Sequence, residues 1–260
     1  MIVEINESMD DYFDTTDAIT AALREENSPI LQTLHGFDGY FRKTLWRDAG
    51  GVGPIAMVLS MNAYMLFLAG VRVAMTGHVT ACFPVLRTAL ESACYGYLIA
   101  KDSELSAVWT DRHKDADSKK ACRKAFGSAV TDVAKRVERE QPGGGQWLAD
   151  AYDAAIDFGA HPNIKSVFGH VRILEDVPED PYFRVNLAGL YGADHWETYR
   201  MLIGCLDFAL AIAVVLTRAL DNPDQEHQEQ LQALNDEKNR VSKAFFSGGS
   251  EADDDDAAQT

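Results

Sequence analysis

The chain has 260 residues, of which 47% are hydrophobic, so it can bury a core as one large domain or two small ones. Its net charge of −16 comes mainly from the ends, because 1–28 hold eight acids against one Arg and 221–260 hold eleven acids against three bases. The acidic start is not expected to act as a signal peptide, and four cysteines without metal-site or disulfide spacing predict reduced thiols, a cytoplasmic location, no metal and no cofactor.

Apolar residues recur at helical spacing along nearly the whole chain, which predicts an all-α fold. The first predicted helix begins near Met9. The second begins after Ser28, whose side chain is expected to cap it, with Pro29 in the first turn. A glycine-rich break at 50–53 separates this helix from the next one.

Residues 54–75 form the next predicted helix, which we expect to be buried at the centre of the fold. The stretch 49–71 contains no charged residue and is long enough to cross a bilayer. Its glycine-rich start, together with Ser60 and Asn62, favours a buried helix in a soluble protein over a membrane span.

The second half of the chain begins with an apolar helix over 80–101 and a shorter one after Ser103. One amphipathic helix is predicted from Cys122 to Val137, and another follows from Trp147. Alternating apolar and polar residues around the run EDVPEDP predict an inserted β-hairpin at about 168–188.

A long apolar helix capped by Asp194 is predicted next, and it ends before Asn222 and Pro223. The remaining residues are polar, and the last of them are strongly acidic and contain no large apolar side chain. We therefore predict a single helical bundle over 1–222, an exposed polar helix over 223–247 and a disordered acidic tail over 248–260.

Arg87 and Glu91 are the leading candidates for a functional pair. They lie four residues apart inside the apolar helix, so they share one helical face and are expected to pair. A buried, unpaired charge would cost several kcal/mol. The pair is either a structural clasp or an Arg oriented by Glu to hold an anionic group.

His161 and Asp207 are the other candidates near this pair. His161 lies at a predicted helix end, where the macrodipole favours it, or it acts as a positioned acid or base. Asp207 lies in the middle of an apolar helix and needs a partner, for which Arg87 or His161 would serve. Together, Arg87, Glu91 and His161 are expected to converge at the centre of the bundle.

A weaker catalytic candidate is the pair Arg72 and His78. The string RVAMTGH separates Arg from His by five residues, a spacing that matches the Arg-x(4–6)-His motif of HEPN-type ribonucleases. On a continuous helix these two residues face different ways, so Thr76 and Gly77 would have to break the helix between them.

The segment 112–139 holds nine Lys or Arg against four acids and is the most basic part of the chain. It is either a solvated helix face or an anion-binding surface for nucleic acid. The residues that would contact nucleic acid are Lys119, Lys120, Arg123 and Lys124.

Two segments carry a resemblance to known proteins, GHVTACFPVLRTALESACYGYLIAKDSELSAVW and YDAAIDFGAHPN. They resemble a recurring pattern in all-helical bacterial proteins, some of which are described as HEPN-like or abortive-infection-like. The resemblance covers about 75–165 and implies a helical fold. It carries over candidate site or structural roles for Arg87, Glu91, Trp109, Arg112, Tyr152, His161 and Pro162.

No motif in the chain indicates a particular reaction, so three hypotheses about function stay open. The first is a non-enzymatic scaffold or interaction protein that forms a homodimer, with no role at a membrane. The second is a HEPN-like ribonuclease or nucleic-acid-binding defence effector. The third is a helical sensor that binds a small anion, with Arg87, Glu91, Arg112, Tyr152, His161 and Asp207 as candidate binding residues.

Overall fold

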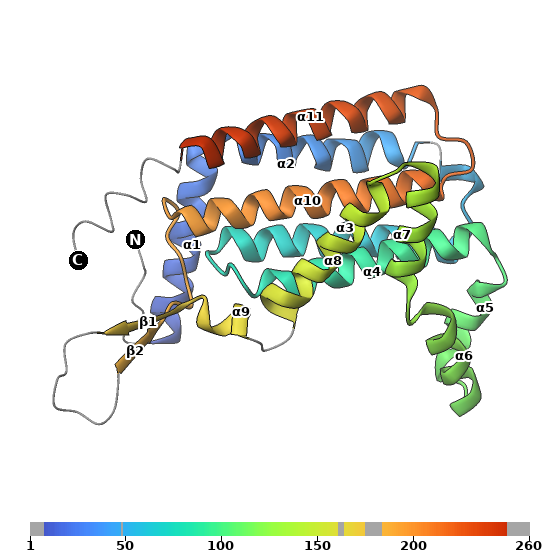
Figure 1. The fold of residues 1–260 in the computed structure, drawn as a ribbon, viewed down its shortest axis with the longest axis horizontal. Coiled ribbons are helices and arrows are strands. Elements are labelled where there is room, and N and C mark those ends of the chain that lie inside the picture. Colours follow the sequence, from blue (N-terminus) through green and yellow to red (C-terminus); the bar gives the residue numbers. More distant parts are fainter. Residues whose placement is uncertain (1–7, 48, 161–163, 175–183, 249–260) are drawn as a thin grey trace.

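The computed structural model describes residues 8–47, 49–160, 164–174 and 184–248. Most of the long helices lie side by side along one axis and form a bundle, so the predicted all-α class is confirmed (Figure 1). The first half of the chain forms α1 (Met9–Glu26), α2 (Pro29–Gly39), the π-helix η1 (Tyr40–Leu45), the 3-10 turn η2 (Ala49–Gly51), α3 (Pro54–Met75) and α4 (Cys82–Lys101).

The second half of the chain contributes a set of short helices, two strands and the last two long helices. In chain order they are α5 (Leu105–Thr110), η3 (Asp111–His113), α6 (Ala116–Phe126), α7 (Ala129–Glu140), α8 (Gly144–Ala155), the π-helix η4 (Ile156–Ala160), α9 (Ile164–Phe168), β1 (Val171–Leu174), β2 (Arg184–Leu187), α10 (Trp196–Ala219) and α11 (Gln225–Gly248).

The central helix of the bundle is α10, which packs against α2, α3, α4 and α11. Most of its side chains are buried, as the apolar sequence requires for a helix surrounded on several sides. Its N-cap is His195, whose Nδ1 accepts a hydrogen bond from the backbone N–H of Glu197 at 3.1 Å, and not the predicted Asp194.

A tightly packed hairpin of α3 and α4 lies against α10. Two glycines allow this close approach: a Cβ on Gly70 would lie 2.6 Å from Cδ2 of Leu86, and one on Gly96 would lie 3.1 Å from the carbonyl oxygen of Ala56. The predicted bounds of 54–75 agree with α3, because proline in its first turn and the end of the apolar pattern are local signals.

The single amphipathic helix predicted across 122–137 is wrong, because the structure divides this segment into α6 and α7. The division falls at Gly127 and Ser128, where the Gly127 N–H still bonds to the carbonyl of Arg123 but a new helix begins two residues later. Glycine disfavours helix interiors and serine favours starts, so the break has a local cause that the continuous apolar spacing concealed.

The polar helix predicted as exposed over 223–247 is α11, and one of its sides is buried against α2 and α10. His227, Lys238 and Val241 are buried on that side. The helix is therefore part of the bundle, which corrects the prediction. Residues 249–260, which make up nearly all of the predicted acidic tail, lie outside the described residues.

Two short strands lie within the segment that was predicted to form a β-hairpin. β1 and β2 pair antiparallel, with Val171 opposite Leu187 and Leu174 opposite Arg184. Residues 175–183, between the strands, lie outside the described part of the chain, so the complete hairpin stays a prediction.

Candidate functional site

Arg87 and Glu91 of α4 meet Tyr152 of α8 in a triad of mutual hydrogen bonds. The Arg87 Nε donates to Glu91 Oε1 at 3.0 Å and its Nη2 donates to the Tyr152 hydroxyl at 3.1 Å. The same hydroxyl donates to Glu91 Oε1 at 2.7 Å, and the guanidinium carbon lies 5.2 Å from the centre of the Tyr152 ring. The triad therefore ties α4 to α8.

The triad is half-buried, since the side chains of Arg87 and Glu91 are 25% and 30% exposed. Burial opposes the charge on Arg87, but hydrogen bonding to Tyr152 and the charge of Glu91 outweigh it and raise the pKa of Arg87. Burial and then the hydrogen bond to Glu91 raise the pKa of Tyr152. Near neutral pH the triad holds one ion pair and a neutral phenol.

The sequence predicts that Arg87, Glu91 and His161 converge at the centre of the bundle. Arg87 and Glu91 line a small cavity of about 120 Å³ with Tyr95, Phe126 and the turn that follows α6. Arg87 and Glu91 are partly exposed to solvent at this cavity. The prediction that they lie in the closed core is therefore wrong. His161 lies outside the described residues.

Asp207 pairs with Lys238 of α11 and not with Arg87. The Lys238 Nζ donates to Asp207 Oδ1 at 2.7 Å, and the two side chains are 10% and 39% exposed. The sequence did not indicate this pair, because α11 reads as an exposed helix until its packing against α10 is known. Here a buried lysine and a more exposed carboxylate join two helices.

Arg72 and His78 have separate partners. Arg72, near the end of α3, forms an ion pair of 3.3 Å with Asp17 of α1. His78, in the turn after α3, contacts the Tyr12 hydroxyl through Nε2, and its Nδ1 lies 2.7 Å from Thr76 Oγ1. Burial lowers the pKa of His78, which favours its neutral form near pH 7. The nuclease role of the pair stays a hypothesis.

The basic residues of 112–139 divide between two environments. Arg112 lies in η3, where its Nη1 is 3.9 Å from Sγ of Cys122. The predicted nucleic-acid contacts all lie on α6, which projects from the body of the bundle (Figure 1). All of them are exposed: Lys119, Lys120, Arg123 and Lys124.

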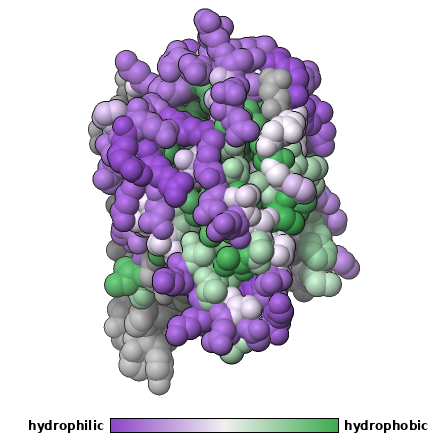
Figure 2. All heavy atoms as spheres, turned by 90° about the vertical axis from the view of Figure 1, so that its right-hand side faces the viewer, coloured by the Kyte–Doolittle hydropathy of each residue, from purple (hydrophilic) through white to green (hydrophobic). Residues whose placement is uncertain are grey.

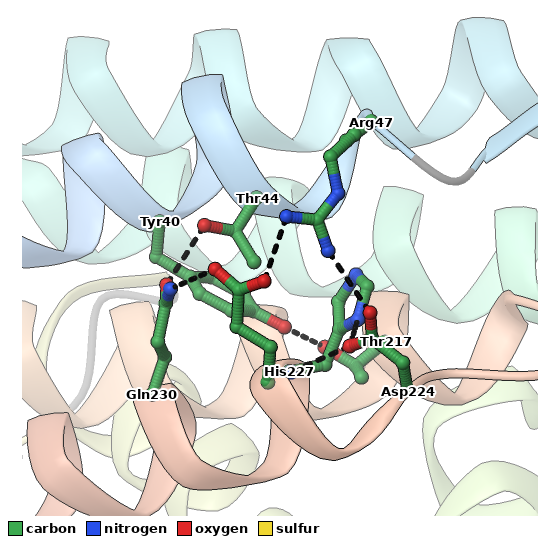
Figure 3. A network of polar contacts seen from close by, with 8 residues as sticks. Tyr40, Thr44, Arg47, Thr217, Asp224, His227 and Gln230 are labelled. Atoms are coloured by element: carbon green, nitrogen blue, oxygen red, sulfur yellow. Dashed lines mark hydrogen bonds and ion pairs between the residues drawn. The ribbon is translucent and has the colours of Figure 1, made fainter.

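A polar network that the sequence did not indicate joins the start of α11 to η1 and α10 (Figure 3). The Tyr40 and Thr217 hydroxyls lie 2.5 Å apart, and Thr44 donates to Gln230 at 2.7 Å. Buried His227 bonds to Asp224 at 2.6 Å. These partners lie as many as 186 residues apart in the chain, so the network is visible only after folding.

This network fastens α11 to the bundle. Arg47 bonds to Asp224 at 3.0 Å and to Glu226 at 2.8 Å, at the surface of the network. The backbone and side-chain hydrogen bonds of His227 are the first cause of the lowered pKa of Asp224, and Arg47 adds to it. Burial raises the pKa of Tyr40 to about 12, so its hydroxyl stays protonated. Every described role here is structural.

One face of α3 is apolar and exposed. Val58, Met61 and Met65 are 57%, 54% and 60% exposed and recur at helical spacing, one turn apart. No charged residue occurs on α3 before Arg72. Figure 2, which views the molecule from the end that holds α5 and α6, shows hydrophobic surface gathered beside hydrophilic surface. By length and composition, α3 and α10 both pass as membrane spans.

Within the described residues, no three His, Cys, Asp or Glu side chains gather as ligands of a metal ion. All four cysteines are buried free thiols, and burial raises the pKa of Cys82 to about 12. In the comparisons with known proteins, no family model, no curated protein and no solved structure matches the chain.

Proposed function

We propose that this protein is a cytoplasmic, non-enzymatic interaction protein that works as a homodimer, and that its two copies meet at the exposed face of α3. The observation that carries the proposal is the row formed by Val58, Met61 and Met65, which the bundle leaves uncovered. Soluble monomers rarely expose contiguous apolar patches of this kind, and such patches mark interaction sites. Burying this surface gains about 25 cal/mol per Å².

A second copy of the chain suits this face because the face carries no charge. In a two-fold dimer the same surface meets itself, so a charge near the two-fold axis would face its own copy. Methionine is enriched in interfaces, and its flexible side chain adapts to an opposing surface. Met61 and Met65 therefore support self-association.

The apolar row is narrow, so neighbouring residues must complete a stable interface of roughly 800 Å² per partner. On the adjoining side, α4 extends the uncharged surface. Asn62 donates to Ser92 Oγ at 3.0 Å, which joins the two helices although Ser92 itself is buried, and Thr88 and Val85 lie one and two turns before Ser92. Thr88 is exposed and Val85 is partly exposed.

A membrane is the rival occupant of this face, and the charge of the chain argues against it. The cytoplasmic leaflet is negatively charged and attracts basic segments. This chain carries a net charge of −16. The other apolar helix, α10, is mostly buried inside the bundle. A protein contact is therefore favoured over a lipid contact.

Sedimentation equilibrium of the full chain tests the proposal. We expect a dimer for the wild type, a monomer with an unchanged melting temperature for Met61→Glu and Met65→Glu, and a dimer for the control Phe246→Glu, which charges an exposed apolar residue of α11. A wild type that stays monomeric up to high concentration contradicts the proposal. Binding to vesicles of phosphatidylcholine and phosphatidylserine, lost in Met61→Glu, would assign the face to a membrane instead.

Nucleic-acid binding is the second candidate, and the projecting α6 is the observation that favours it. The Lys and Arg side chains of α6 are exposed to solvent and so are available to phosphate groups. Replacing Lys119, Lys120, Arg123 and Lys124 with Gln is expected to weaken RNA or DNA binding and to flatten its salt dependence. If the intact protein shows no binding at low salt, both this candidate and the HEPN-like nuclease hypothesis fail.

A further inference from the structure

A cavity of about 310 Å³ lies between α8 and α10, close to the start of α4. It is separate from the exposed face of α3 and from the triad of Arg87, Glu91 and Tyr152. Its volume is at the lower end of the range of about 300–1,000 Å³ that is typical of small-molecule pockets. Most of its wall is apolar, and its lining includes three charged residues, Asp150, Arg200 and Asp207.

Small residues on the two facing helices leave this space open. Ala151 and Ala154 line it from α8, and Gly204 lines it from α10. A Cβ on Gly204 would approach only the flexible end of Met201, at 3.0 Å from Cε, so the backbone does not require glycine there. In a core packed at ordinary density, larger side chains would fill such a gap.

Aromatic side chains from four elements, α4, α8, η4 and α10, surround the cavity. Phe83 of α4 and Phe158 of η4 are tilted together with their ring centres 5.9 Å apart, and Trp147 and Phe208 complete the wall. The π-helix η4 positions Phe158, and single π-helical turns are frequent at functional sites. The faces of aromatic rings carry negative charge density and attract cations.

The charges at the edge leave one carboxylate without a counter-ion. Arg200 is held by Glu197, 2.6 Å away on its own helix, and Asp207 is held by Lys238. Asp150 accepts a hydrogen bond from Gln146 Nε2 at 2.7 Å, and it forms no ion pair with any residue in the described part of the chain. The edge of the cavity is therefore negative.

We propose that this cavity binds an organic cation with an apolar body, such as an alkylammonium compound. The alkyl part would lie against Phe83, Trp147 and Phe158, and the positive head would lie near Asp150. The negative charge of the whole chain would also raise the local concentration of a cation. This inference rests on the cavity alone and does not depend on self-association at α3.

Isothermal titration of the full chain tests the site with hexyltrimethylammonium, and with hexanoate and hexanol as anionic and neutral probes of matched chain length. We expect saturable binding of one cation per chain and about tenfold weaker binding of hexanoate and of hexanol, because a charged contact is lost. Asp150→Asn is expected to weaken cation binding by about tenfold. Asp153→Asn, an exposed change on the same helix, is expected to leave it unchanged.

Ala154→Leu fills the cavity and is expected to abolish binding of the cation. If that variant fails to fold, as judged by its thermal melt, the comparison of Asp150→Asn with Asp153→Asn decides. The proposal is overturned by the absence of saturable cation binding, by equal affinity for hexanoate, or by equal effects of the two Asp variants.

Discussion

The helices α3 and α10 are alike in composition and different in surroundings. Both are long and apolar enough to cross a membrane, yet 78% of the most apolar stretch of α10 is buried in the bundle and only 33% of that of α3. α10 is surrounded by α2, α3, α4 and α11, whereas α3 leaves one face exposed. Two helices of similar apolar composition therefore have different positions in this molecule: one is buried in the core, and the other leaves an apolar face on the surface.

The positions of charged residues also differ between α3 and α10. α10 carries Asp207 within its apolar sequence, and α11 supplies Lys238 to pair with it. α3 carries no charge along the exposed row and begins to carry one only at Arg72. A core helix tolerates a charge when a partner reaches it, as Lys238 reaches Asp207.

The largest expected difference between the two helices is in core stability. Leu206→Ala on α10 removes a fully buried side chain and is expected to lower the free energy of unfolding by about 2–5 kcal/mol. Met65→Ala on α3, measured in the Met61→Glu background so that the proposed self-association does not contribute, is expected to change it by less than about 0.5 kcal/mol. Urea denaturation measures both, and equal losses would contradict the comparison.

The next largest loss of stability is expected when the Asp207–Lys238 ion pair is broken. The two single variants are expected to differ in how much stability they lose. Asp207→Asn leaves the Lys238 ammonium buried without its counter-ion and is expected to cost roughly 2–4 kcal/mol. Lys238→Met leaves Asp207, which water reaches, and is expected to cost less. Denaturation curves in which Lys238→Met is the more damaging change would show that the burial of this pair is misjudged.

The triad on α4, the helix that packs against both α3 and α10, is expected to contribute less to the free energy of unfolding than a buried pair. Because Arg87 and Glu91 are partly exposed, Arg87→Met or Glu91→Leu should each cost about 1–2 kcal/mol. The double variant should cost less than the sum, since each single change already removes the one Arg87–Glu91 interaction and leaves the other partner unpaired. Strict additivity in denaturation would mean that the two side chains do not interact.

A smaller effect is expected from pH at the end of α3. Burial lowers the pKa of His78 and of His170 below 6.5 in the folded protein, so the unfolded chain binds more protons in mild acid. The part of the free energy of unfolding that depends on neutral His78 and His170 is fully present above pH 6.5. It is lost as the pH falls through the folded pKa values. His78→Gln should flatten the fall in melting temperature below pH 6.5, and an unchanged slope would contradict this assignment.

The smallest effect concerns the end of α11, the helix that covers α10. Residues 249–260 contain five acids and no large apolar side chain, so they have little surface to bury. Deleting them should change the free energy of unfolding by less than about 0.5 kcal/mol. A fall of many degrees in the melting temperature would show that this segment docks on the bundle.

Features with local causes were predictable from the sequence. Ser28 caps α2 with Pro29 in its first turn, α3 has its predicted bounds, and Arg87 pairs with Glu91 one helical turn away. In each case the signal lies within a few residues of the feature. The all-α class follows from the sum of such signals.

Features with long-range causes were not predictable. The partner of Asp207 depends on where α11 packs, and the network of Tyr40, Thr217 and His227 joins residues from both ends of the chain. The exposure of Met61 and Met65 has the same origin, since an apolar helix reads alike whether neighbours cover one side of it or all sides. Only tertiary structure shows which side stays open.

Cross-linking at the centre of the α3 face tests the central claim most directly. The native cysteines are buried, so a cysteine introduced at Met61 is the reactive thiol on that face, and Ala233→Cys on the exposed side of α11 is the matched control. We predict that a short bis-maleimide converts Met61→Cys, but not Ala233→Cys, to a covalent dimer at low protein concentration. A Met61→Cys protein that stays monomeric, or that cross-links no more than Ala233→Cys, would contradict the claim that two copies meet at α3.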